Sequence, residues 1–134
     1  MSTTQRTSVS SGTKWESLAG YARAVRVGDT IHVSGTTATD ENGNVVGGDD
    51  TAAQTRYAIQ KIERAIIALG GTLNDVVRTR IFVSDIANWE AAARVHGEFF
   101  SEIRPANTLV QARLVGPEYL VEIEAEAIVR ESSK

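Results

Sequence analysis

The sequence predicts an α+β fold in which a single mixed β-sheet carries two helices on one face. Two stretches have apolar residues at helical spacing, one between Asp50 and Gly70 and one from Trp89 to Phe100. Segments rich in β-branched residues lie before, between and after them, so the predicted order is ββαβαββ. This order favours one sheet with both helices on the same side. The 134 residues contain no repeat or low-complexity stretch and fit a single domain.

The first half of the chain is expected to form a hairpin followed by a helix. Strands are predicted at 21–27 and 30–35, joined by Gly28-Asp29. Asp49 or Asp50 is predicted to cap the first helix, and Gly70-Gly71 to end it. The side of the helix opposite its apolar stripe is expected to be solvated, and consists of Arg56, Lys61, Glu63 and Arg64.

The second half is expected to add three strands and the second helix. A strand at 76–83 is predicted to place Val77, Ile81 and Val83 on one side. The helix from 89 to 100 is followed by strands at 108–114 and 120–129, which a turn at 116–118 separates.

Composition excludes several classes of function. The chain has no cysteine, which excludes disulfides, thiolate metal sites and a cysteine nucleophile. Its net charge of −3 and the absence of a basic stretch interleaved with aromatics argue against nucleic-acid binding. Residues 1–14 are rich in Ser and Thr without an apolar core, so neither a signal peptide nor a membrane span is expected there. We expect a mobile tail over 1–14, one domain over 15–134, a cytoplasmic location and no membrane partner.

The last predicted strand carries three carboxylates on one side. Alternation places Glu122, Glu124 and Glu126 together, opposite an apolar set. Glu124 and Glu126 are expected to pair with arginines across strands or between subunits, the candidates being Arg78, Arg80 and Arg113.

Several landmarks follow one another in a fixed order over about four-fifths of the chain. They are Gly20-Tyr21-Ala22-Arg23-Ala24, Val33-Ser34-Gly35, Gln54-Thr55, Asp75-Val76-Val77, Phe99-Phe100, Pro105-Ala106 and Val121-Glu122-Ile123-Glu124-Ala125. Together they resemble the YjgF/RidA (UK114-like) superfamily. The resemblance implies a chorismate-mutase-like fold and a homotrimer with small-molecule clefts between subunits. It also implies hydrolysis of reactive enamines and imines without a cofactor.

The resemblance assigns site residues one by one. Glu122 aligns with the glutamate that positions the hydrolytic water, and Tyr21 with a tyrosine of the cleft wall. Gly35, preceded by Ser34, aligns with the glycine whose N–H meets the ligand carboxylate, and Trp89 with a cleft phenylalanine from the neighbouring subunit. Three of them have an alternative role: covering the core for Tyr21, core packing for Trp89 and a close turn for Gly35.

Asn107 is the main departure from the family. The usual string Pro-Ala-Arg-Ser is replaced by Pro105-Ala106-Asn107-Thr108, so an amide stands where an arginine binds the substrate carboxylate. Loss of a charge-assisted hydrogen bond costs about 1.5 to 3 kcal/mol. We therefore expect poor hydrolysis of 2-iminopropionate. A small carbonyl or imine substrate at Glu122, a non-catalytic metabolite-binding trimer and a chaperone-like interaction protein remain as alternatives.

No metal site is predicted. His32 and His96 are the only histidines, and neither lies in a spacing typical of metal ligands.

Overall fold

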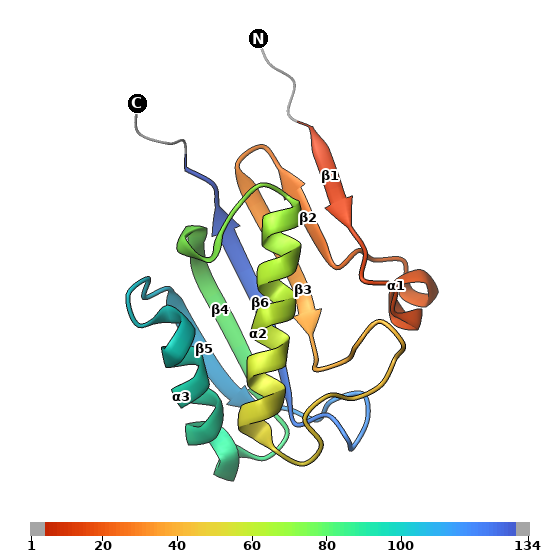
Figure 1. The fold of residues 1–134 in the computed structure, drawn as a ribbon, viewed down its shortest axis with the longest axis vertical. Helices are drawn as coiled ribbons and strands as arrows, with labels where there is room; N and C mark the ends of the chain where they lie inside the picture. Colours follow the sequence, from red (N-terminus) through yellow and green to blue (C-terminus); the bar gives the residue numbers. More distant parts are fainter. Residues whose placement is uncertain (1–4, 131–134) are drawn as a thin grey trace.

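The computed structural model describes residues 5–130, which form one six-stranded mixed sheet and three α-helices (Figure 1). The strands are β1 (Arg6–Val9), β2 (Ala24–Val27), β3 (Thr30–Thr36), β4 (Val76–Val83), β5 (Ala106–Gln111) and β6 (Val121–Ile128). The helices are α1 (Lys14–Ala19), α2 (Thr51–Ala68) and α3 (Trp89–Phe100), with short 3-10 turns at Leu73–Asp75 and Ile86–Asn88. The predicted α+β class and mixed sheet are confirmed.

The sheet order is β1-β2-β3-β6-β4-β5. All neighbouring strands are antiparallel except β4 and β5, which run parallel because α3 connects them. As a result β6, the last strand, lies in the middle of the sheet between β3 and β4. Glu122 is therefore held by hydrogen-bonded strands on both sides.

The long helices α2 and α3 lie side by side on one face of the sheet (Figure 1), and Arg56 of α2 pairs with Glu98 of α3 at 2.8 Å. The Asp50 side chain accepts a hydrogen bond from the Ala53 N–H, which confirms the predicted cap. Gly70 ends the helix with a φ of 93°. The largest fully buried apolar side chains between helices and sheet are Ile31, Ile59, Ile62, Ile66, Ile81, Val83, Val121 and Ile123.

Two predicted strands begin or end elsewhere. The strand expected from residue 21 starts at Ala24, and the strand expected at 108–114 runs from Ala106 to Gln111. In addition, the predicted side of Val77 is wrong. The register of β4 against β6 shifts between Val76 and Arg78, so this bulge leaves Val77 exposed while Ile81 and Val83 point into the core.

The expectation of a mobile tail over residues 1–14 is wrong where the structure describes them. Arg6–Val9 forms the edge strand β1, paired antiparallel with β2, and the segment after it runs into α1. Trp15 of α1 contacts Tyr119 edge-on, with ring centroids 5.9 Å apart. Residues 1–4 lie outside the described part.

Within residues 5–130, no helix covers the second face of the sheet (Figure 1). There the predicted ion pairing holds in part. Glu124 lies 3.5 Å from Arg80, and Glu126 lies 3.4 Å from His32 rather than an arginine. Since β6 contributes its Glu122, Glu124 and Glu126 side to this surface, Glu122 opens onto it as well.

Candidate functional site

A pocket of about 250 Å³ lies where β3 ends and β6 begins. Three predicted site residues line it, namely Tyr21, Gly35 and Glu122. Arg23 and Lys61 line it as well. Its remaining wall consists of Thr13, Trp15, Ala19, Thr37, Val115 and Tyr119.

Gly35 allows the Glu122 carboxylate to lie directly against the backbone of β3. A Cβ atom built on Gly35 would stand 2.0 Å from Oε2 of Glu122, so no side chain fits there. The register of β3 against β6 shifts between Val33 and Thr36, which places this close approach at a bulge.

Gly35→Ala is expected to lower the free energy of unfolding by about 1 to 3 kcal/mol, because the new methyl group displaces the Glu122 side chain. In a Glu122→Ala background the same change should cost almost nothing, since the obstructing side chain is absent. Urea unfolding of the four proteins of this double-mutant cycle measures both effects. Gly97→Ala is the control, because a Cβ there meets no atom within 4 Å. Equal costs of Gly35→Ala in both backgrounds would contradict the contact.

Arg23 fixes the strand end on which this contact depends. Its Nη1 donates to the Gly35 carbonyl at 2.6 Å and to Oγ1 of Thr36 at 2.9 Å. Its guanidinium also lies 5.6 Å from the centre of the Tyr21 ring. With 4% of its surface exposed, Arg23 is a buried cation and requires a counter-charge.

Glu16 of α1 supplies that charge. Its Oε2 lies 3.4 Å from Nε of Arg23, and its carboxylate accepts hydrogen bonds from Ser10, Ser11 and Thr13. Burial by itself would raise the pKa of Glu16, but these hydrogen bonds outweigh burial and lower the pKa to about 2. The carboxylate is therefore ionised at neutral pH and ties α1 to the pocket.

Glu122 has the opposite electrostatic environment. Burial raises the pKa of its carboxyl group above the usual value, and the nearby negative charge of Glu124 raises it further, while Arg23 acts in the other direction. A half-buried carboxyl group with a raised pKa is better suited than an exposed one both to accept and to return a proton.

The sequence predicted that Lys61 lies on a solvated helix face. This prediction is wrong. Only 7% of its surface is exposed, and Nζ donates to the Thr39 carbonyl at 2.8 Å. Burial lowers the pKa of this amine to about 8, and the positive charge of Arg23 contributes to the same shift. The Lys61 amine therefore lies between α2 and the loop at Thr39, in the lining of the pocket.

Other predicted site residues lie away from this pocket. Asn107 donates to Oγ1 of Thr79 at 2.9 Å, and that hydroxyl is also 2.8 Å from Nε2 of His96 on α3. Burial lowers the pKa of His96. These contacts direct the Asn107 amide toward the helix-covered side of the sheet, whereas Glu122 lies on the open side.

The remaining predicted site residues also lie outside the pocket, namely Thr108, Trp89 and Ser34. Oγ1 of Thr108 accepts a hydrogen bond from Arg78 at 2.7 Å. Trp89 begins α3 with half of its surface exposed. The Ser34 hydroxyl donates to the Ala22 carbonyl at 2.7 Å. Arg23 and Lys61 instead line the pocket, and Glu16 pairs with Arg23 behind it. The sequence indicated none of these three as a site residue, although Arg23 stood within a landmark string.

The model of the Endoribonuclease L-PSP family matches residues 12–129 of the chain. The chain belongs to this family. Among its relatives, 3-aminoacrylate deaminase RutC of Acinetobacter baylyi is 41% identical over 112 residues, which cover 84% of this chain and 89% of RutC. The resemblance to the YjgF/RidA superfamily is thereby confirmed.

Two solved structures share the fold. Rv2704 of Mycobacterium tuberculosis, a member of the YjgF/YER057c/UK114 family, is 49% identical with a TM-score of 0.85, covering 93% of this chain and all 100% of that one. YEO7 of yeast is 26% identical with a TM-score of 0.82, covering 94% of this chain and 100% of the other.

Within residues 5–130, no group of three or more His, Asp or Glu side chains is arranged to hold a metal ion. No helix in that range is long and apolar enough to cross a membrane.

Proposed function

We propose that this YjgF/RidA family member hydrolyses a small imine or enamine in the pocket of Tyr21, Gly35 and Glu122. The observation that carries the proposal is the Glu122 carboxylate, which is half-buried, has a raised pKa and lies against the Gly35 backbone inside the pocket. The 41% identity to RutC, a 3-aminoacrylate deaminase, supports the same class of reaction.

In the proposed reaction, the oxygen of a water molecule adds to the C=N carbon while Glu122 accepts a proton from that water. The imine nitrogen receives a proton, and the resulting carbinolamine loses ammonia to leave a ketone or aldehyde. The overall balance is one imine and one water to one carbonyl compound and one ammonia. A raised pKa suits Glu122 because one carboxyl group takes up and returns the proton.

We further propose that the active assembly is a homotrimer in which Trp89, Asn107 and Thr108 of one protomer complete the pocket of the next. Two observations support this arrangement. In the part of the chain that the structure describes, no helix lies over the sheet face that carries Glu122, Glu124 and Glu126 (Figure 1). Asn107, moreover, does not line the Glu122 pocket of its own protomer. An uncovered sheet face of this kind is commonly buried by oligomerisation.

The experiment is an ammonia-release assay with 3-aminoacrylate, 2-iminopropionate and a neutral imine, combined with light scattering. We expect turnover of at least one compound by a species of three protomers, with the neutral imine favoured because Asn107 carries no charge. A stable monomer at micromolar concentration would contradict the trimer. Stoichiometric binding of a carbonyl compound without ammonia release would instead favour the non-catalytic binding trimer.

Asn107→Arg is expected to increase hydrolysis of 2-iminopropionate by up to roughly thirtyfold, because a fixed cation opposite the substrate carboxylate contributes about 2 kcal/mol. Steady-state kinetics of the variant measures the effect. Asn107→Lys is the control, since lysine adds the charge without the two-pronged geometry of arginine. A folded, trimeric arginine variant no faster than wild type would show that residue 107 does not face the substrate.

A further inference from the structure

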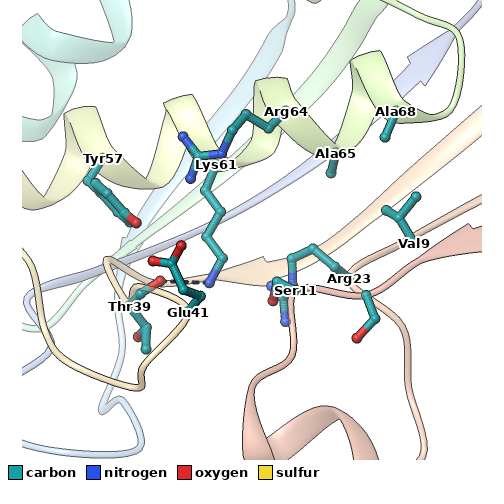
Figure 2. Close-up of a pocket in the computed structure, with 11 residues that line it drawn as sticks. Val9, Ser11, Arg23, Thr39, Glu41, Tyr57, Lys61, Arg64, Ala65 and Ala68 are labelled. Atoms are coloured by element: carbon teal, nitrogen blue, oxygen red, sulfur yellow. Dashed lines mark hydrogen bonds between the residues drawn. The ribbon is translucent and has the colours of Figure 1, made fainter.

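A second cavity, of about 510 Å³, lies between α2 and the end of β1 (Figure 2). Arg23 and Lys61 line both cavities and form the wall between them, whereas Glu122 lines only the first. The proposed reaction does not use this second cavity.

Positive charge predominates in the cavity lining. Figure 2 shows Lys61 and Arg64 extending from α2, with Arg64 next to Tyr57. The Arg64 guanidinium lies 5.6 Å from the centre of the Tyr57 ring. Among the ion pairs of residues 5–130, Arg64 has no acidic partner. The charge of Arg23 is neutralised by Glu16. The acidic residue in the lining is Glu41, which makes no ion pair within residues 5–130.

The Lys61 ammonium has donors to spare. An ammonium carries three N–H groups. Within the described residues Nζ has one hydrogen-bond acceptor, the Thr39 carbonyl, although the side chain is 7% exposed (Figure 2). A buried cation with unused donors beside a cavity is an incomplete arrangement, because burying charge without full hydrogen bonding is costly.

The opposite part of the cavity is apolar. Val9 of β1 and Ala65 and Ala68 of α2 form this surface, at the other end of the cavity from Tyr57 (Figure 2). A ligand that fits both parts has one charged end and an apolar body.

We propose that this cavity binds a small organic anion, with its carboxylate or phosphate group held by Lys61 and Arg64 and its apolar body against Val9, Ala65 and Ala68. Burial and Arg23 already disfavour the charged form of Lys61 and lower its pKa. A bound anion acts in the opposite direction and raises this pKa, which provides a direct measure of binding. The site belongs to one protomer and does not depend on the proposed hydrolysis.

The probes are phenyl phosphate, benzoate and benzyl alcohol, the last being of similar size but neutral. Calorimetric titration is expected to show binding of both anions, with phenyl phosphate the tighter, and none of benzyl alcohol. Lys61→Met should weaken phenyl phosphate binding roughly tenfold or more, and Arg64→Gln should weaken it by a smaller factor. Arg56→Gln is the matched control, since Arg56 lies on the same helix, pairs with Glu98 and is absent from the cavity lining.

A second measurement uses the unmodified protein. Its lysines are Lys14, Lys61 and Lys134, so three side-chain NMR signals can be titrated separately. Phenyl phosphate should raise the pKa of one lysine only, the signal that Lys61→Met removes. Binding of benzyl alcohol equal to that of the anions, unchanged affinity in both cavity variants, or a Lys61 pKa unaffected by phenyl phosphate would each overturn the proposal.

Discussion

Glu122→Gln is expected to slow hydrolysis of an accepted imine by about 100- to 10,000-fold, the usual contribution of a positioned proton-transfer group. Glutamine keeps the size of the side chain and its contact with Gly35 but cannot take a proton from water. The folded state and the proposed trimer should therefore persist while turnover is lost. Steady-state kinetics with light scattering on the same samples measures both properties.

Glu126→Gln is the control, because Glu126 lies on the same side of β6 but pairs with His32. It should leave the rate within about twofold of wild type, as a surface pair of this kind contributes little. Turnover that survives Glu122→Gln would reduce Glu122 to a structural residue and remove the basis of the proposed reaction.

The pH profile provides an independent readout of Glu122. Its carboxyl group must be ionised to accept a proton, and burial raises its pKa above 4.5. The rate should therefore increase with pH through this raised pKa. Glu124→Gln should move the increase to lower pH, because the charge of Glu124 contributes to the shift.

Glu16→Gln is expected to lower the free energy of unfolding by about 3 kcal/mol at pH 7, the largest stability effect among our predictions. In the folded protein the pKa of Glu16 falls from 4.5 to about 2. The unfolded chain consequently takes up the proton first as the pH falls. The contribution of Glu16 is complete above pH 4.5 and disappears as the pH decreases through about 2.

Urea unfolding at pH 7 and pH 3, at one fixed protein concentration, tests this expectation. The difference between wild type and Glu16→Gln should be about 2 kcal/mol larger at pH 7 than at pH 3. Glu98→Gln is the control, since its pairing with Arg56 is exposed and should cost less than about 1 kcal/mol. A difference that does not change with pH would show that Glu16 acts through packing rather than through its charge.

Local pattern was sufficient to predict much of the fold. The apolar spacing in α2 and α3, the cap at Asp50 and the alternation along β6 are properties of neighbouring residues, and each predicted its element correctly. Alternation also placed Glu122 on the side opposite Ile123. The family landmarks then added Tyr21 and Gly35, which lie with Glu122 in one pocket.

The sequence by itself thus determined the fold class, the family and three residues of the candidate site, namely Tyr21, Gly35 and Glu122. Tertiary structure decided the rest, because it depends on segments that are distant in the chain. Lys61 reads as a solvated residue on a helical wheel, and it is buried because the loop at Thr39 supplies an acceptor to its amine. Glu16 pairs with Arg23 because β1 pairs with β2 and the segment after β1 brings α1 next to Arg23. No periodicity of neighbouring residues predicts a contact of this kind.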